Sequence, residues 1–427
     1  MHLPLKTLFF NPLRRHHLPL RLLHHRHLYP QPPPPPPTIE YPLTHPIYAI
    51  WAANTFLGKT LVSSGLSIAF LTSTSTIVNI PKKFVYLKPI QTGFPDDSDS
   101  LSVYSKFSKF FPRNRPEFSI FASNHVLNAS GPAARALLGK RWESGGFGNG
   151  KVGNFGVGLR VWGAGACSEL ICKTVYRWRE PISPHLAAGR EGAALEDSEL
   201  LEMLKRGMQN GVGKYGNKDV GAMCVIETAG GVASPGPSAI LVGDGRLGGI
   251  SGTISAYESL KLRGYDVVAV VFEDHGLVNE VPLSCYLQNG IPVFLLPPVP
   301  QDMSNDLTEW FKKSQTVFSS LKEIMLSAFH GRMQKLHDMW KRAHDIFWWP
   351  FTQHEIVPIE NIIVIDSRCG EKFAVHKASS YDLITQQFDA CASWWTQGPY
   401  INLQDPAYAV LPQHCLPSIS KLDWEKD

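Results

Sequence analysis

The sequence has few of the features that mark membrane, zinc-binding or disulfide-rich proteins. No apolar run reaches the roughly 18 to 20 residues that a membrane-spanning helix needs. The seven cysteines include no Cys-x-x-Cys pair, which argues against a zinc site or a disulfide framework and favours reduced thiols. A net charge of +4 is small for 427 residues, so we expect neither nucleic acid nor a membrane as a partner.

Acidic residues are missing from residues 1–39, which carry basic residues among leucines and end in the proline tract Pro32 to Pro37. This composition predicts an organellar transit peptide followed by a stiff, extended spacer. Serine enrichment is absent, so a disordered basic tail is the alternative. The basic residues are Lys6, Arg14, Arg15, Arg21 and Arg26.

The chain after this segment alternates short apolar runs with helical patterns. Strands are predicted at "IYAIWAAN", at 84–87 (ending at Lys88, before Pro89), and at 222–227, 239–243, 266–272 and 292–296; helices are predicted at 196–208 and 305–347. Buried strands separated by helical stretches predict a doubly wound, mainly parallel α/β sheet over residues 41–325. The glycine-rich segment 144–166 predicts a surface loop, because no strand precedes it and no helix follows.

The stretch "AANTFLGKTLVSSGL" ends like a phosphate-binding loop but lacks the opening glycine, since Ala52 stands there. Alanine suits that position only if the backbone keeps φ below zero. Lys59 would then reach the β- and γ-phosphates of a nucleotide, and the Thr60 hydroxyl would bind Mg²⁺. A Gly-Lys-Thr triplet alone is weak evidence, because short motifs often arise by chance.

Ligands of open parallel sheets bind at the carboxyl ends of the strands, so the residues that leave those ends are the candidate site. An acid that ends an apolar strand is costly to bury without a cation or a basic partner, which singles out Glu227. Together these residues would suit Mg²⁺-assisted phosphoryl transfer from ATP. The candidates are Asn54, Thr55, Gly58, Lys59 and Thr60 from the first strand, Lys88 and Thr92 from the second, Asp96, Asp97 and Asp99 from the following acidic loop, and Glu227, Gly230 and Gly231 from the third.

Six stretches, in order over roughly residues 47–300, resemble the dethiobiotin synthetase family of P-loop NTPase-type ligases. They are "ANTFLGKT", "KPIQTG", "EPISPHLAA", "VIETAGGVASP", "GDGRLGGISGTISA" and "GLVNEVPL". A partition-type ATPase would share the fold but should lack the segment Ser183 to His185. The resemblance implies an ATP- and Mg²⁺-dependent ligase that converts diaminopelargonate and CO₂ to dethiobiotin, in mitochondria, as a homodimer.

The resemblance also implies roles for the matching residues. Lys59 would bind phosphate, while Thr60, Asp99 and Glu227 would hold Mg²⁺. Lys88 would neutralise a substrate carbamate, and Thr92 would support the same intermediate. Nucleotide binding would fall to the loop residues Asn54, Thr55, Gly58, Lys59 and Thr60 together with Gly230 and Gly231.

The C-terminal stretches "FWWPFTQH", "VIDSRCGEKF" and "FDACASWWTQGP" resemble the start of the diaminopelargonate aminotransferases, pyridoxal-phosphate (PLP) enzymes whose pocket tryptophans match Trp348, Trp394 and Trp395. The region that supplies the Schiff-base lysine is not in the sequence. We therefore expect neither PLP nor aminotransferase activity. The predicted organisation is 1–39 leader and spacer, 40–325 synthetase-like domain, 326–399 aminotransferase-like fragment and 400–427 divergent tail.

The connection Thr228 to Ala239 is short and rich in glycine, proline, alanine and serine. Neighbouring parallel strands need a crossover of a dozen or more residues, usually with a helix. The sequence therefore predicts a strained or mispaired strand at 240–243 and an uncovered patch of sheet. It leaves open the alternative of an inactive truncated product that at most binds nucleotide.

Overall fold

The computed structural model describes residues 41–42, 45–73, 81–111, 120–126, 155–161, 168–192, 195–212, 221–228, 238–262, 265–288, 290–300, 307–346, 358–369, 372–380 and 383–388. All of them lie within the unit Thr38–Asp427. Expectations for the leader, the tail 400–427, Trp348, Trp394, Trp395, Gly230 and Gly231 fall outside the described residues. None of the described helices is long and apolar enough to cross a membrane.

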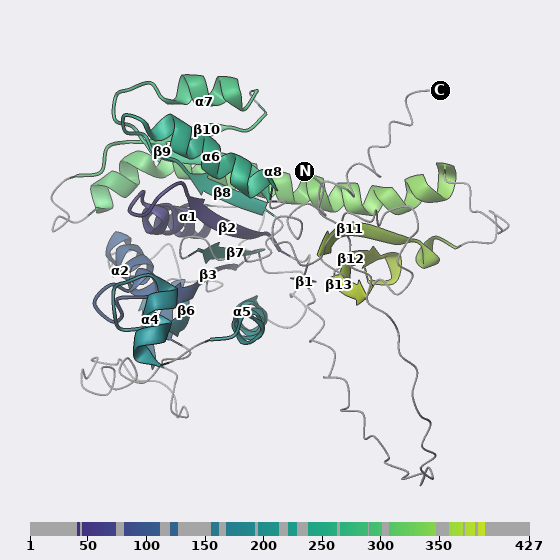
Figure 1. Cartoon of the computed structure of the whole chain (residues 1–427), viewed down its shortest axis with the longest axis horizontal. Helices are drawn as coiled ribbons and strands as arrows, with labels where there is room; N and C mark the ends of the chain where they lie inside the picture. The colour runs from purple at the N-terminus through teal and green to yellow at the C-terminus, as the bar shows by residue number, and fades with distance from the viewer. Residues whose placement is uncertain are drawn as a thin grey trace, which may run out of the picture. The chain divides into compact units, whose positions relative to one another are not determined.

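The larger of two sheets has the strand order β10-β9-β8-β2-β7-β3-β6-β4-β5 (Figure 1). All of its pairings are parallel except that of β4 with β5. Its strands are β2 (Ile47–Ala52), β3 (Lys82–Gln91), β4 (Ile120–Val126), β5 (Phe155–Val161), β6 (Ser168–Arg177), β7 (Gly221–Glu227), β8 (Ser238–Val242), β9 (Asp266–Glu273) and β10 (Val293–Leu296). The doubly wound, mainly parallel α/β fold is therefore confirmed.

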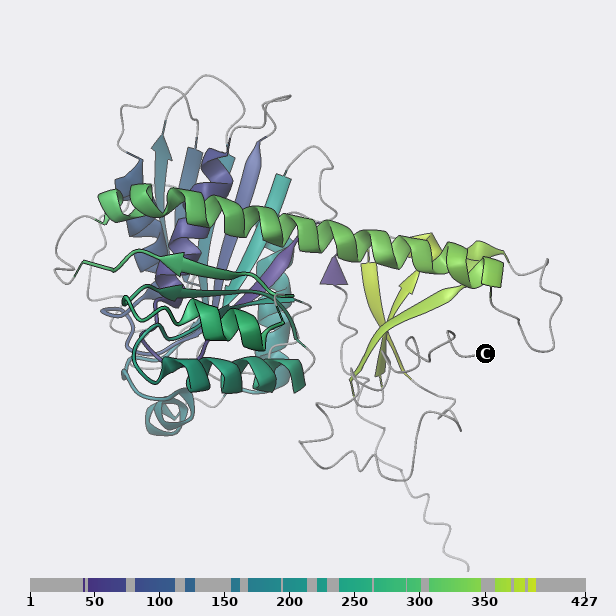
Figure 2. The same cartoon turned by 90° about the horizontal axis from the view of Figure 1, so that it is seen from above.

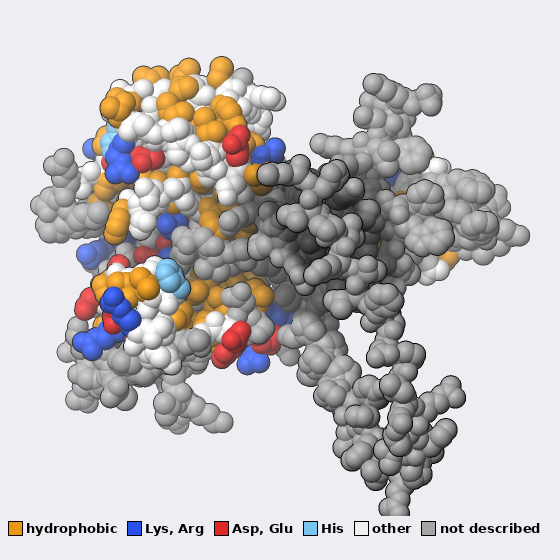
Figure 3. Space-filling view, in the orientation of Figure 1, with side chains coloured by type: hydrophobic (Ala, Val, Ile, Leu, Met, Phe, Trp, Pro, Cys, Tyr) orange, Lys and Arg blue, Asp and Glu red, His pale blue; other side chains and the backbone are white. Residues whose placement is uncertain are grey.

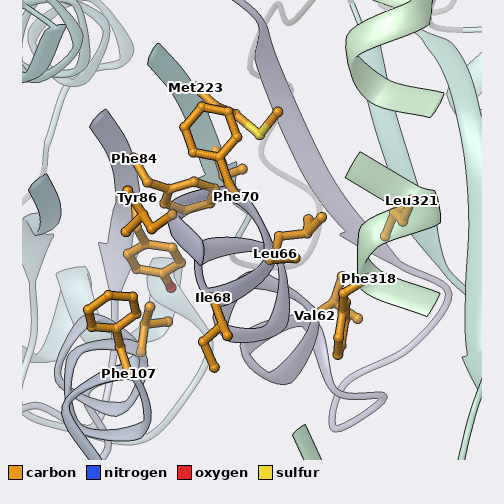
Figure 4. Packing of buried hydrophobic residues seen from close by; sticks show 14 of the residues in the cluster. Val62, Leu66, Ile68, Phe70, Phe84, Tyr86, Phe107, Met223, Phe318 and Leu321 are labelled. Carbon is orange, nitrogen blue, oxygen red and sulfur yellow. The ribbon is translucent and has the colours of Figure 1, made fainter. Parts of the chain in front are cut away.

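Helices cover both faces of this sheet. One face buries a large apolar core under α1 (Lys59–Thr72), α2 (Asp99–Phe110) and the first half of α8 (Thr308–Ile346). Figure 4 shows part of this core, with Phe318 and Leu321 of α8 facing α1. The opposite face carries two separate cores, one under α4 (Pro184–Glu191) and α5 (Asp197–Val212), the other under α6 (Gly249–Leu262) and α7 (Glu280–Tyr286).

The close contact between α1 and α8 depends on a glycine. A Cβ atom at Gly65 would lie 2.2 Å from the ring of Phe318. Only glycine therefore allows the helix that follows the candidate phosphate loop to pack this tightly against α8.

The smaller sheet is antiparallel, in the order β1-β13-β12-β11, formed by β1 (Tyr41–Pro42), β11 (Ile363–Cys369), β12 (Lys372–Lys377) and β13 (Leu383–Phe388). Two 3-10 turns, Ile359–Asn361 and Ala378–Ser380, flank its strands. Its core includes Leu336 and Trp340 from the second half of α8, which Figure 2 shows as one unbroken helix. The domain boundary at residue 325 falls within α8 and stays a prediction.

Three rings form a stack in the smaller core. The imidazole of His376 is fully buried and lies against Trp340, with 4.6 Å between ring centroids and 20° between planes. His337 stacks on His376 at 6.0 Å. This group of His337, Trp340 and His376 is called the ring stack below.

The prediction of a mispaired strand after the short connection is wrong. β8 is not a neighbour of β7; it pairs along its whole length with β2, which lies between them, and also with β9, apart from one register shift at Ala239/Ile240. All five β8 residues are buried, as is β2 from Ile47 to Trp51, so these strands leave no uncovered patch. An extended segment of ten residues reaches roughly 33 Å, more than enough to pass beneath one strand to the next position.

Two further expectations need correction. Residues 155–161, placed in a surface loop by their glycine content, form the edge strand β5 on β4. β3 does not end at Lys88 but continues through Pro89 to Gln91 beside β6, because its pairing with β7 already ends at Leu87 and the proline interrupts no ladder on that side. Lys88 therefore lies within the strand.

Candidate nucleotide and metal site

The candidate phosphate loop connects β2 to α1. Ala52 is the last residue of β2, in extended conformation, and the backbone N–H of Ala53 donates to the carbonyl of Val242 at 2.9 Å. The backbone turns at Gly58, which has φ +92° and directly precedes Lys59 at the start of α1. Alanine therefore fits position 52, because the backbone there is extended and does not need a glycine. Gly58, by contrast, could not be replaced by another residue without backbone strain.

The loop itself is open to solvent. Phe56 is 97% exposed and has φ +60°, an uncommon conformation for an aromatic residue. The side chain of Asn54 accepts a hydrogen bond from the backbone N–H of Thr55 at 2.8 Å, which holds the loop locally. The backbone groups at the start of α1 are thus placed where a phosphate could reach them.

Next to this helix start, residues from four elements form a largely buried polar group, called the carboxylate cluster below. Its members are Thr60 and Ser63 of α1, Tyr86 and Lys88 of β3, Asp99 of α2 and Glu227 of β7. The structure brings Thr60, Lys88, Asp99 and Glu227 together as the sequence predicted. Figure 3 shows basic and acidic side chains at the protein surface between the α6–α7 layer and α4.

Lys88 is the central cation of the cluster. Its ammonium nitrogen lies 2.7 Å from Asp99 Oδ2 and 3.2 Å from Glu227 Oε1, and only 5% of the residue is exposed. Burial alone would lower the pKa of Lys88, but the carboxylates of Glu227 and Asp99 outweigh it and raise the pKa above its ordinary value. Lys88 is therefore charged at neutral pH.

Lys59 experiences the opposite balance. Burial lowers its pKa, and the Lys88 ammonium lowers it further against the pull of Glu227 and Asp99. An anion that bound at the start of α1 would offset this effect, because it would place negative charge near the Lys59 ammonium. The charged form of Lys59 would therefore be favoured by an anion at the position predicted for phosphate.

The oxygen atoms of the cluster suit a magnesium ion. Thr60 Oγ1 lies 2.9 Å from Glu227 Oε1 and 3.1 Å from Asp99 Oδ1, so three hard oxygen ligands from three segments converge. Mg²⁺ is usually held by one or two carboxylates together with water and substrate phosphates. The described residues contain no cluster of three or more His, Cys, Asp or Glu that could hold a metal ion.

A glutamine that the sequence analysis overlooked fixes the acidic loop. Gln91 is buried, and its Nε2 donates to the carbonyls of Thr92 at 2.9 Å and Asp97 at 2.5 Å. Its Oε1 accepts from the backbone N–H of Asp99 at 3.1 Å. Gln91 thereby sets the position at which α2 begins and at which Asp99 enters the cluster.

Tyr86 and Ser63 were also missed. Tyr86 lies two residues before Lys88 and so on the same face of β3, and Ser63 lies one helical turn after Lys59. These spacings could have indicated both hydroxyls. They were hidden because Tyr86 reads as part of an apolar strand and Ser63 as part of a helix core.

On the other side of β2, the loop after β8 is fixed by polar contacts of its own. Asp244 binds Arg246 through both carboxylate oxygens, at 2.8 Å and 2.7 Å. The buried Asn279 donates to the carbonyls of Gly245 and Arg246. A Cβ at Gly245 would lie 1.9 Å from the carbonyl oxygen of Glu273, so this loop packs directly on the end of β9.

Comparison with known proteins gives a clear set of relatives. A protein of Arabidopsis thaliana named bifunctional dethiobiotin synthetase/7,8-diamino-pelargonic acid aminotransferase, mitochondrial, is 53% identical over 410 residues, which cover 89% of this chain and 46% of that protein. A rice protein of the same name is 46% identical and covers 85% of this chain and 44% of its own length. The chain is a homologue of these bifunctional proteins.

The chain spans about half of the length of the plant proteins it matches. An ATP-dependent dethiobiotin synthetase of Acidiphilium cryptum is 32% identical over 123 residues, or 27% of this chain and 55% of that enzyme. No protein-family model matches the chain.

Solved structures resemble the chain only weakly. A ParA family ATPase from Chlorobium tepidum has a TM-score of 0.34 at 7% identity, covering 65% of this chain and 98% of that one. The septum site-determining protein MinD with Mg-ADP from Pyrococcus horikoshii has a TM-score of 0.30 at 15% identity, covering 65% and 95%. Such scores carry no argument about function.

Proposed function

We propose that this chain is a dethiobiotin synthetase, which uses ATP and Mg²⁺ to convert diaminopelargonate and CO₂ to dethiobiotin. The observation that carries the proposal is the carboxylate cluster, in which Thr60, Asp99, Glu227 and Lys88 meet beside the phosphate loop. The names of the homologues support the same reaction.

The proposed reaction has three steps. One amino group of diaminopelargonate adds to CO₂ and loses a proton, which gives a carbamate. A carbamate oxygen then takes the γ-phosphoryl group of ATP and ADP leaves, which gives a carbamic–phosphoric anhydride. The second amine attacks the carbamoyl carbon, the bond to the phosphate oxygen breaks, and the cyclic urea of dethiobiotin forms with release of phosphate.

The chain's own residues bind and orient these reactants. Lys59 and the start of α1 would bind the ATP phosphates, aided by Gly230 and Gly231 after β7. Thr60, Asp99 and Glu227 would hold Mg²⁺, which supplies charge neutralisation at the transferred phosphoryl group. The ammonium of Lys88 would neutralise the carbamate, and Thr92 would support it. Catalysis would thus rest on positioning and charge stabilisation.

The homologues' names also bear on location. Because the plant relatives are named mitochondrial, we propose the mitochondrial matrix for this chain, with residues 1–39 as its transit peptide and proline-rich spacer. A reporter fused to residues 1–39 should enter mitochondria and should fail to do so when Arg14, Arg15 and Arg21 are replaced by glutamate. We further propose a homodimer, which light scattering would test.

The decisive experiment is a direct assay of the full chain. ATP- and bicarbonate-dependent conversion of diaminopelargonate to dethiobiotin should be present, and Lys59→Ala should lower it about 100-fold or more, since it removes a preorganised charge at the transferred phosphate. Lys312→Ala, at an exposed lysine of α8 paired with Glu309, is the matched control and should leave turnover unchanged. No turnover from folded, ATP-binding wild-type protein would favour the alternative of an inactive nucleotide-binding product.

A further inference from the structure

The two carboxylate oxygens of Glu227 have different surroundings. Oε1 lies 2.9 Å from Thr60 Oγ1 and 3.2 Å from Lys88 Nζ, on the side where the metal ligands converge. Oε2 points away from these groups and accepts hydrogen bonds from the hydroxyls of Ser63 and Tyr86, each at 2.9 Å. One oxygen thus faces the site and the other is tied to the fold.

The hydroxyl of Tyr86 is held in place by its ring. The side chain is fully buried in the core between the sheet and α1. Figure 4 shows its ring among Ile68, Phe84 and Phe107. If the Glu227 carboxylate rotated, the tightly packed Tyr86 ring could not move with it. The Tyr86 hydroxyl therefore acts as a hydrogen-bond donor in a fixed position.

Ser63 holds the same oxygen less firmly. Its hydroxyl has a single proton and lies 3.0 Å from the carbonyl of Lys59 as well as 2.9 Å from Glu227 Oε2. The proton is therefore shared between two acceptors. For Tyr86, the acceptor in the described part of the chain is Glu227.

We propose that Tyr86 is a positioning residue for the metal site: its hydroxyl fixes the Glu227 carboxylate so that Oε1 faces the cation position beside Thr60 and Asp99. The identity of the cation rests on the proposed function. Groups that orient a metal ligand in this way change metal affinity although they never touch the metal. Neither the phosphate-loop motif nor the names of the homologues assign such a role.

The test measures how Mg²⁺ strengthens nucleotide binding by the full chain. A fluorescent ATP analogue is titrated at a series of Mg²⁺ concentrations and in excess EDTA. Tyr86→Phe keeps the ring and removes the hydroxyl, and it should raise the Mg²⁺ concentration for half-maximal effect about tenfold or more, with binding in EDTA unchanged.

The matched control is Tyr48→Phe. Tyr48 lies on β2 in the same buried core, and its hydroxyl donates to the carbonyl of Met325, away from the cluster. This variant loses an equivalent buried hydrogen bond but should leave the Mg²⁺ dependence within about twofold of wild type, because no metal ligand is involved. Equal shifts in both variants would reduce Tyr86 to a structural role and overturn the proposal.

A third variant covers the case in which Tyr86→Phe fails to fold. Ser63→Ala leaves Tyr86 as the remaining hydroxyl that donates to Glu227 Oε2, and it should shift the Mg²⁺ dependence less than about threefold. A tenfold shift would show that Ser63, and not Tyr86, positions the Glu227 carboxylate. Failure of the two proposals is distinguishable. Mg²⁺-dependent binding without dethiobiotin formation defeats only the proposed reaction, and turnover with an unchanged Mg²⁺ dependence in Tyr86→Phe defeats only this inference.

Discussion

The carboxylate cluster and the ring stack both bury polar side chains, but they differ in what those side chains can do. The cluster joins one ammonium to two carboxylates and three hydroxyls, at the carboxyl-end region of parallel strands. The ring stack joins the faces of two imidazoles and an indole, where the second half of α8 packs on an antiparallel sheet. Burial of polar groups is common to both, so burial alone does not indicate a candidate site. What distinguishes the carboxylate cluster is that opposite charges converge beside the start of a helix.

The largest effect should come from removing the negative charge of Glu227 from the carboxylate cluster. Glu227→Gln keeps the shape of the side chain but leaves Lys88 with Asp99 alone. We expect the free energy of unfolding to fall by about 3 to 5 kcal/mol, since a buried ion pair is broken, and turnover to fall about 100-fold. Urea unfolding and the dethiobiotin assay measure the two effects.

A matched carboxylate is available as a control for this substitution. Glu169→Gln breaks the half-buried pair with Lys83 at the opposite end of β3, where the separation is 3.0 Å. It should cost less than about 1 kcal/mol and leave turnover intact. If the two variants were equally damaging, the cluster would have no special place in the fold or the chemistry.

The next largest effect should distinguish the ring stack from the carboxylate cluster by substitutions in the two halves of α8. Trp340→Ala removes the indole of the ring stack and should lower the stability of the smaller core by about 3 kcal/mol. Mg²⁺-dependent ATP binding should be unaffected, because the cluster receives no residue from the second half of α8.

Trp310→Ala, in the first half of α8, is the companion variant. Trp310 packs on Phe311 and Phe318, the latter against α1, and its indole N–H donates to the carbonyl of Pro297 at 2.9 Å. This variant should weaken ATP binding together with stability. If Trp340→Ala lost as much ATP binding as Trp310→Ala, the ring stack and the carboxylate cluster would not be independent of each other.

The smallest effect concerns acid. His45, 5% exposed and just before β2, has its pKa lowered by burial from 6.5 to about 4. Between these values the unfolded chain binds a proton that the folded chain does not, so stability is complete above pH 6.5 and declines as the pH falls. The loss should reach about 2 kcal/mol at pH 5.

The stability of His45→Gln should therefore depend less on pH over this range. His275→Gln, at an exposed histidine near Glu273, should retain the full dependence and serves as the control. An equal acid sensitivity of wild type and His45→Gln, measured by urea unfolding at pH 7 and pH 5, would contradict the assignment.

The parts of the site that the sequence predicted are those with a local signature. Lys59 and Thr60 follow a glycine at a helix start, and Glu227 ends an apolar strand. Tyr86 and Gln91 carry no such mark, because their roles come from partners such as Asp99 and Glu227 that only the folded sheet brings near. Local pattern thus indicated the candidate ligands, whereas only the tertiary structure shows which residues contact them.

The same limit explains the errors in the fold. The short segment after Glu227 suggested strain because strands that are close in sequence were assumed to be neighbours in the sheet. In the structure β2 lies between β7 and β8, and the order of strands is not written in the order of the chain. β5 escaped prediction because glycines weaken strand propensity, yet pairing with β4 along its whole length compensates.

The central position of β2 in the sheet means that the parts of the site are synthesised at different times. Both of its partner strands, β7 and β8, come much later in the chain, and Thr60 meets Glu227 across 167 residues. At about 5 to 20 residues per second, a ribosome needs roughly 8 to 33 s to cover that distance. Until β7 has been synthesised the nascent chain has Lys59, Thr60 and Lys88 but not Glu227, so the carboxylate cluster can be completed only after β7 has joined β2.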